Sequence, residues 1–307
     1  MNFNTKVHFD FIKHKNKFFI FSIALTVAGI LSLLIFNLNL GVDFKAGTNM
    51  DITVGKNITQ AEAKDVLESV GITNITPTIG GANNHLVSAR FDEVLEQNKI
   101  KEVRDAFVAK FGDQVSYEVN VVSPDMAQEL GIKTIWGIII ASVAIMIYVM
   151  IRFEWRFALA ANIAILYDAF VVIAMFSIFR LEVDLPFIAA VLTTIGYSIN
   201  DKIVIFDRIR ENLRFGKFKT TEQLSDMVNQ SLWQTMERNI YTVLAVLIIA
   251  TCLFIFGSES IKLFALAKMI GLASGAYSSI CIASPLWLLL KSKQKNPKAK
   301  QTAKSAV

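Results

Sequence analysis

The stretch TIGYSINDKIVIFDRIREN, Thr194 to Asn212, decides the class of fold to which this chain belongs. Its first half closes an apolar run that begins at Pro186 and is long enough to cross a bilayer, yet it carries Asn200, Asp201 and Lys202. Ionisable side chains are costly inside a membrane, and they are by default candidates for a functional role. The stretch therefore predicts a membrane protein with a polar site inside its helical bundle.

The composition of the whole chain supports a membrane protein. Of 307 residues, 53% are hydrophobic and 19% are charged, and the mean hydropathy is +0.47, whereas soluble domains carry about 25% charged residues. The net charge of +5 is small for a nucleic-acid-binding protein, so no nucleic-acid partner is expected. The sequence has no phosphate-binding loop, nucleophile–base pair or metal-ligand spacing, so no enzyme activity, cofactor or metal is expected. Cys252 and Cys281 lie in apolar runs and are predicted to be buried small hydrophobes.

Six segments are long and apolar enough to cross a bilayer as helices of about 20 residues: Phe18–Phe36, Thr134–Ile151, Phe157–Phe179, Pro186–Phe206, Ile240–Phe256 and Phe264–Leu290. The first is expected to be a retained span, because no small-residue cleavage site follows it. The predicted organisation is a tail at 1–17, the first helix at 18–36, an external domain at 37–133, a five-helix bundle at 134–290 and a basic tail at 291–307. Residues 207–239 form a cytoplasmic amphipathic segment within that bundle.

Basic residues predict the orientation. They gather before the first span, after the second, after the fourth and after the last, in the clusters Lys6–Lys17, Arg152–Arg156, Arg208–Arg238 and Lys291–Lys304. All four clusters fall on the same side of a six-span chain, and the positive-inside rule makes that side cytoplasmic. Both termini are therefore expected in the cytoplasm.

The connection 37–133 is predicted to be a small α+β domain outside the cytoplasm. It has nine Lys/Arg against fourteen Asp/Glu. Period-2 alternation predicts strands at 49–54, 73–79, 85–91 and 115–122, and helical periodicity predicts helices at 59–70 and 100–111. Thr59 and Glu62 form a capping-box signature at the start of the first helix. The order β-α-β-β-α-β is typical of a ferredoxin-like fold, and a binding module and an unspecialised spacer both remain open.

A second capping-box signature, at Thr220–Gln223, precedes an apolar stripe formed by Leu224, Val228 and Leu232. The pattern predicts a helix that lies on the membrane surface or packs against its own bundle.

The fourth predicted span has a polar face. Thr194, Tyr197, Ser198 and Asp201 follow one another at helical spacing, with Asn200 beside them. Intramembrane carboxylates often take part in proton relays, so Asp201 is the first candidate for a proton path, and a structural helix-pairing role is the alternative.

Two further charges are candidates for the same path. Asp168 lies in the middle of the third span among apolar neighbours, and it therefore needs a partner from another helix. Arg238 precedes the fifth span at a depth similar to that of Asp201, and it could hold the carboxylate ionised. The alternative for Arg238 is a side chain that snorkels to the membrane surface.

The end of the fourth span carries a polar signature, Asp207, Arg208, Arg210, Glu211 and Asn212. Its residues can pair at i+3 and i+4, or they can form a solvated anchor at the membrane surface.

Four motifs, in order, resemble the SecF family of bacterial protein-export membrane proteins, which is part of the SecD/SecF family and is similar to the resistance-nodulation-division transporters. They are Gly41-Val42-Asp43-Phe44 with Gly47-Thr48 after the first span, Tyr167-Asp168, GYSINDKIVIFDRIREN from Gly196 to Asn212, and Gln234-Thr235-Met236-Glu237-Arg238. The resemblance covers essentially the whole chain.

The resemblance implies a six-helix half-transporter that pairs with SecD in the bacterial inner membrane. It implies late-stage export of polypeptides driven by the proton-motive force, with the residues matching Asp201 and Arg238 in the proton path and a mobile external domain. The implied partners are the SecYEG channel with SecA, YajC and YidC, the translocating polypeptide and the lipid bilayer.

The sequence departs from the family pattern at three places. Lys202 replaces a small residue, Asn239 a threonine, and Lys45-Ala46 a Thr-Gly pair. Adjacent helix positions point about 100° apart, so Lys202 is not required to contact Asp201. Two other functions stay open: an independent proton-coupled exporter of small molecules or lipids, and a scaffold subunit that conducts no protons.

Overall fold

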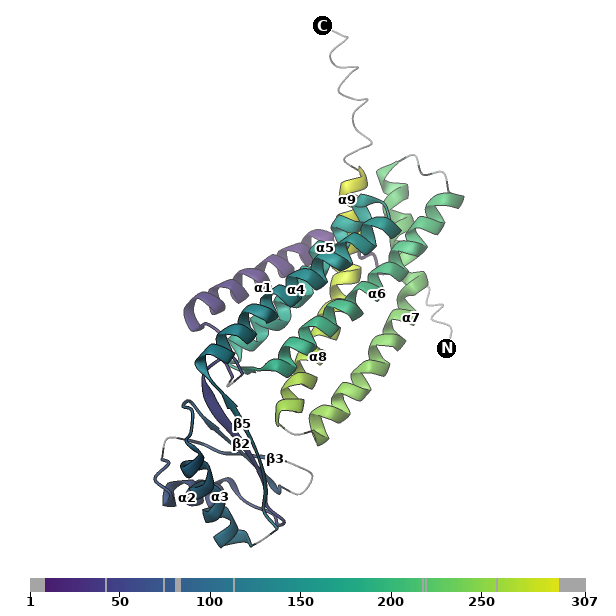
Figure 1. The fold of residues 1–307 in the computed structure, drawn as a ribbon. Helices are drawn as coiled ribbons and strands as arrows, with labels where there is room; N and C mark the ends of the chain where they lie inside the picture. Colours follow the sequence, from purple (N-terminus) through teal and green to yellow (C-terminus); the bar gives the residue numbers. More distant parts are fainter. Residues whose placement is uncertain are drawn as a thin grey trace.

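The computed structural model describes residues 9–292, apart from 42, 74, 81–83, 113, 217, 219 and 258. It shows a bundle of long helices with a small α+β domain at one end (Figure 1). Lys6 and the predicted tail beyond Ser292 lie outside the described residues, as does Val42 of the first motif.

Within the described residues, six helical segments are long and apolar enough to cross a membrane, as predicted. They are α1 (Lys15–Phe36), α4 (Pro124–Arg152), α5 (Trp155–Ile178), α6 (Leu185–Phe215), α7 (Thr221–Phe256), and α8 (Glu259–Ser278), which continues through a π-helical turn, η1 (Ser279–Ala283), into α9 (Ser284–Ser292). Helices α5, α6 and α8 are the most enclosed, whereas α1, α4 and α7 present apolar side chains on the outside. Cys281 is buried as predicted, but Cys252 is exposed because it lies on the outer face of α7.

The α+β domain has the predicted β-α-β-β-α-β order. Its elements are β2 (Gly47–Thr53), α2 (Gln60–Ser69), β3 (Thr78–Gly80), β4 (Leu86–Phe91), α3 (Gln97–Phe111) and β5 (Ser116–Val122). The sheet is antiparallel in the order β3-β4-β2-β5. Side chains of β2 such as Met50 and Ile52 pack with Leu67 of α2 and Phe107 of α3. The capping box of Thr59 and Glu62 is formed at the start of α2.

Two local features differ from the sequence pattern. Strand β3 is shorter than predicted, and it starts just after Pro77, which has no N–H to donate to a ladder. Strand β1 (Asn39–Leu40) pairs in parallel with β6 (Glu182–Val183), a contact between segments far apart in the sequence. Two-residue strands are too short to show a periodicity, so this pair could not be predicted from the sequence.

The amphipathic segment 207–239 is divided between two long helices. Helix α6 continues to Phe215, and α7 runs from Thr221 to Phe256 as one helix, with the capping box of Thr220 and Gln223 at its start. The apolar side chains Leu224, Val228 and Leu232 are buried in the core of the bundle. The segment therefore packs on its own bundle and is not a separate helix on the membrane surface.

The ends of α4, α6 and α9 and the start of α7 lie at the end of the bundle remote from the sheet (Figure 1), and the described basic clusters of the sequence lie next to these helix ends. Arg152 at the end of α4 lies 3.7 Å from Asp207 of α6, and Lys291 of α9 lies 3.5 Å from Glu154. The segment before α1 is held at the same end, because Trp233 Nε1 of α7 donates to the carbonyl oxygen of Phe9 at 3.0 Å. One end of the bundle is therefore basic, as the charge pattern predicts.

The opposite end joins the bundle to the α+β domain through residues of the first motif. The Gly41 N–H donates to Val183 O at 2.8 Å, and the Leu185 N–H donates to Asp43 Oδ2 at 2.9 Å, at the start of α6. A Cβ on Gly41 would lie 2.6 Å from Glu182 Oε1 and 3.2 Å from Val183 O, so a larger residue would require the Glu182 side chain to move. Glu182 in turn forms an ion pair with Arg90 of β4.

The other motif residues also have structural contacts. Phe44 packs against the bundle core, Gly47 opens β2, and the buried Thr48 hydroxyl donates to Glu93 O and accepts from the Leu95 N–H. The first motif therefore connects the domain to the beginning of α6.

Asp184 should make the stability of this junction pH-dependent. It caps α6 by accepting from the Phe187 N–H at 2.9 Å, and burial, together with nearby Asp43, raises the pKa of its carboxyl group. A raised folded-state pKa means that stability falls as pH rises from the ordinary value of about 3.9 through the folded-state pKa, and stays lower above it. Asp184→Asn keeps the acceptor and should flatten this dependence, whereas Asp184→Ala should cost about 1 kcal/mol through the lost cap. Thermal unfolding between pH 4 and pH 8 checks both variants, and equal slopes for the unmodified chain and Asp184→Asn would contradict the assignment.

Candidate functional site

A fully enclosed ion pair joins α5 to α6 in the middle of the bundle. Lys202 Nζ lies 2.9 Å from Asp168 Oδ2, and both side chains are 0% exposed. Asp168 thus has the partner from another helix that its apolar neighbours required. The partner is the residue that departs from the family pattern.

Serine hydroxyls enclose the ion pair. The Asp168 carboxylate accepts hydrogen bonds from Ser198 at 2.5 Å, from Ser274 at 2.7 Å and from Ser278 at 2.7 Å. Lys202 Nζ also donates to the hydroxyl oxygens of Ser198 at 2.5 Å and Ser278 at 2.9 Å, and it lies 3.4 Å from that of Ser279. We call Asp168, Lys202 and these four serines the serine cage.

Small residues on α8 allow the cage to close. Gly271, Ser274, Gly275 and Ser278 share one face of the helix, and a Cβ on Gly271 would lie 2.4 Å from Thr194 of α6. This spacing of small residues is the one that lets membrane helices approach closely. At the last cage residue, Ser279, the chain begins the π-helical turn η1, ahead of Pro285, whose missing N–H breaks the α-helical ladder. The turn places Ser279 beside Lys202.

Asp201 occupies a second, separate position on α6. Its side chain is buried at 2% exposure, and its Oδ2 has no hydrogen-bond partner among the described residues. It interacts electrostatically with Lys202 and with Arg238 of α7. Arg238 itself is exposed, and in the described part of the chain it forms no salt bridge with Asp201.

The predicted polar stripe is divided between two sides of α6. Ser198 faces the cage, and Thr194 touches Gly271 of α8. Tyr197 instead carries Lys268 over its ring at 5.7 Å. Asn200 is exposed, so it does not belong to an enclosed polar face.

The sequence interpretation missed Lys202 and the serines of α8 as site residues. Their signal was present in the i, i+4 spacing of Ser198 and Lys202, and in the run Ser274–Ser279, SGAYSS. That run lies inside the predicted sixth span, Phe264–Leu290. The hydrogen bonds of the cage do not involve Tyr167, whose side chain packs against the core of the bundle.

The signature at the end of α6 fastens α6 to α7. Arg208 pairs with Glu211 at 2.6 Å and Arg210 with Asp207 at 2.8 Å, which are the predicted i, i+3 pairs. Between the helices, Arg208 Nε donates to Gln234 Oε1 at 2.7 Å, and Asn212 Nδ2 donates to Ser231 Oγ at 2.8 Å. These partly exposed contacts hold the helical hairpin together.

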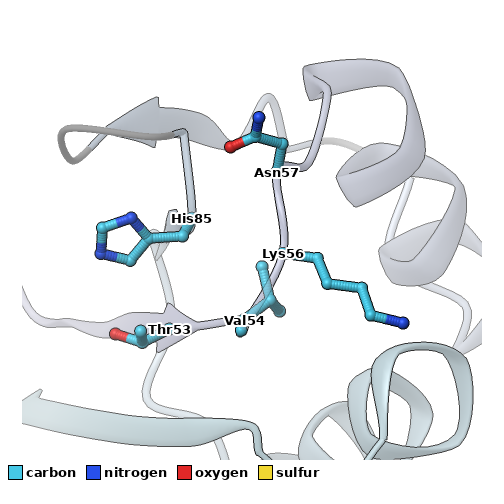
Figure 2. A pocket seen from close by; sticks show the side chains of 6 residues that line it. Thr53, Val54, Lys56, Asn57 and His85 are labelled. Carbon is cyan, nitrogen blue, oxygen red and sulfur yellow. The ribbon is translucent and has the colours of Figure 1, made fainter.

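A hollow of about 650 Å³ lies in the α+β domain at the end of β2, lined by Thr53–Asn57 and His85 (Figure 2). The Lys56 and His85 side chains point away from each other there, so they form no joint binding site (Figure 2). Within the described part of the chain, no three His, Cys, Asp or Glu side chains gather in a way that could hold a metal ion.

Curated relatives cover nearly the whole chain. The protein translocase subunit SecF of Alicyclobacillus acidocaldarius is 44% identical over 291 residues, which is 94% of each chain. The protein translocase subunit SecDF of Bacillus subtilis is 44% identical over 95% of this chain, which corresponds to 40% of that longer protein.

Solved structures have the same fold. The crystal structure of SecDF from Thermus thermophilus, titled a translocon-associated membrane protein, superposes with a TM-score of 0.80 at 28% identity. The match covers 94% of this chain and 39% of that one, so the chain spans about two fifths of the SecDF structure. Residues 102–293 match the family described as protein export membrane protein SecD/SecF, C-terminal. With this match, and with 44% identity over nearly its full length, the chain belongs to the SecD/SecF family of protein-export membrane proteins, as a SecF member.

Proposed function

We propose that this multi-pass membrane protein is the SecF subunit of a protein translocase, and that it works with a SecD partner to export polypeptides using the proton-motive force. The translocase role is supported by the curated relatives, which are named as SecF and SecDF subunits of the translocase. No chemical reaction is assigned to the chain itself.

The observation that carries the proton step is the contrast between two buried carboxylates. Asp168 is neutralised by Lys202 and receives three serine hydrogen bonds. Asp201 is equally enclosed, yet one of its oxygens has no partner among the described residues. A buried carboxylate in this state is costly, and binding a proton removes its charge. We therefore assign proton binding and release to Asp201, and we assign Asp168 a fixed, ionised role.

The surface of the bundle supports the proposed partner, and its basic end supports the proposed orientation. Helices α1 and α4, and α7 from Ile240 onward, expose apolar side chains, and the matching part is about two fifths of the longer SecDF chains. We assign part of this surface to SecD and the rest to lipid. The basic end lies in the cytoplasm and the α+β domain outside the inner membrane, where it meets the translocating polypeptide after SecYEG and SecA. YajC and YidC remain proposed members of the same assembly.

Asp201→Asn tests the proton assignment. Asparagine keeps the size and polarity of the side chain but cannot exchange a proton, so export should fall to the rate of cells that lack the chain. The measurement is the processing of a secreted precursor over minutes in SecF-depleted cells that express either form. Membrane level and co-purification with SecD are recorded in the same cells.

Asp226→Asn is the matched control, because it makes the same chemical change at an exposed position on α7 and should leave export unchanged. If Asp201→Asn assembles normally and restores export, the scaffold function replaces the proton-coupled one. If the chain retains a transport phenotype in cells that lack SecD, the independent exporter gains support instead.

A further inference from the structure

The Lys202 ammonium lies where a small monovalent cation would bind. Five oxygen atoms surround Nζ within 3.5 Å: Asp168 Oδ2, the hydroxyl oxygens of Ser198, Ser278 and Ser279, and the carbonyl oxygen of Ser198. Proteins replace the hydration shell of a monovalent cation with oxygens of these kinds. The surrounding oxygens come from α5, α6 and the junction of α8 with η1.

We propose that Lys202 is a tethered cation that permanently fills this oxygen-lined position, and that it thereby keeps Na⁺ and K⁺ out of the bundle. This consequence rests on the proposed function: with Na⁺ and K⁺ kept out by Lys202, the proton at Asp201 is the sole coupling ion. Lys202 is then a specificity-determining residue and not a proton carrier.

Charge and geometry carry this inference. One carboxylate and one ammonium make the cage neutral, and both side chains are completely enclosed. Removal of the ammonium leaves an uncompensated charge that faces three hydroxyl groups, which is a costly arrangement unless another cation enters. A free cation competes poorly with the native side chain, because displacing the ammonium would leave a buried charge without its oxygen partners.

The test measures the thermal unfolding of the full chain in lipid nanodiscs, in chloride salts of choline, Na⁺, K⁺ and ammonium at constant ionic strength. The unmodified chain should unfold at the same temperature in all four salts. Lys202→Ala should unfold earlier in choline, which is too large for the cage, and should recover by about 3 °C or more in at least one small cation. Lys202→Ala combined with Asp168→Asn is the control, and it should show no cation response because the negative charge is gone.

Two results would overturn the inference. One is a Lys202→Ala variant whose stability is the same in choline as in every small cation. If Lys202→Ala is too unstable to purify, its level in membranes is compared between cells grown in sodium-rich and potassium-rich media, with and without ammonium. An equally low level in all of these media would also overturn the inference. The other is an unmodified chain that is stabilised by Na⁺ or K⁺ through Asp168. The readout is stability and not export, so failure of the Asp201 assignment leaves this result independent.

Discussion

Replacing Lys202 by methionine should lower the free energy of unfolding by about 3–5 kcal/mol, because it leaves the Asp168 carboxylate charged and without its partner in an enclosed site. Asp168→Asn should have an effect of similar size, because it leaves the ammonium unpaired. The double variant, Asp168→Asn with Lys202→Met, should lose much less than the sum of the two, since neither charge remains. Unfolding of the purified chain, followed for the single and double variants, gives the coupling energy between the two side chains.

An exposed ion pair of the same chain provides the control. Lys64 and Glu68 lie 3.6 Å apart on α2, with side chains 48% and 44% exposed, and such pairs are worth about 0–1 kcal/mol. Lys64→Met should therefore change stability little. If the stability losses of the Asp168 and Lys202 single variants simply add in the double variant, the two charges do not compensate each other. That result would contradict the fixed, ionised role assigned to Asp168.

The pairing of Lys202 with Asp168 decides which buried carboxylate is left without a charged partner in hydrogen-bond contact. Asp201 and Lys202 are neighbours in sequence, and a pairing between them would have left Asp168 as the isolated carboxylate. The structure has the reverse arrangement, because Lys202 is four residues after Ser198 and shares its side of the helix. Under the proposed function, Lys202, which departs from the family pattern, gives Asp168 a fixed partner and leaves Asp201 as the proposed proton site.

Most of the fold could be predicted from the sequence because its signals are local. Six apolar runs are sufficient to place the spans, and the amphipathic periods of segments such as 59–70 and 100–111 are sufficient to give the order of the α+β domain. The capping boxes at Thr59 and Thr220 formed because a cap depends only on residues three positions apart.

The serine cage could not be predicted, because it depends on how three helices are rotated against one another. Asp168 lacked a partner in the sequence, but nothing in the pattern distinguished Lys202 from Arg238 as that partner. The same limit applies to Ser278 and Ser279, which both reach Lys202 because the helix changes to a π-helical turn at that point. Helix rotation is set by packing between distant segments, and an amphipathic pattern does not report it in a helix that is apolar on nearly every side.

The packing that sets this rotation leads to a prediction for two glycines of α8. A Cβ on Gly271 would lie 2.4 Å from both Cγ2 and Oγ1 of Thr194, whereas a Cβ on Gly275 would lie 3.5 Å from Ser198. Gly271→Ala should therefore cost about 1–3 kcal/mol of stability through overpacking. Gly275→Ala, which makes the same chemical change one turn away in ordinary van der Waals contact, should be close to neutral, with a helix-propensity gain of up to about 1 kcal/mol.

Thr194→Ala supplies the decisive comparison, because it removes the two atoms that a Cβ at Gly271 would approach most closely and leaves only Thr194 Cβ, at 2.9 Å. The Gly271→Ala penalty should shrink in the Thr194→Ala background if the clash is its cause, and it should persist if glycine is needed for another reason. Thr194 is β-branched and cannot turn aside freely, so the strain in the single variant must move α8 itself. Ser274 and Ser278 would move with the helix and draw away from Asp168. Gly271→Ala should consequently reduce the coupling energy between Asp168 and Lys202 as well, and an unchanged coupling energy would show that the cage does not depend on the close approach of α6 and α8.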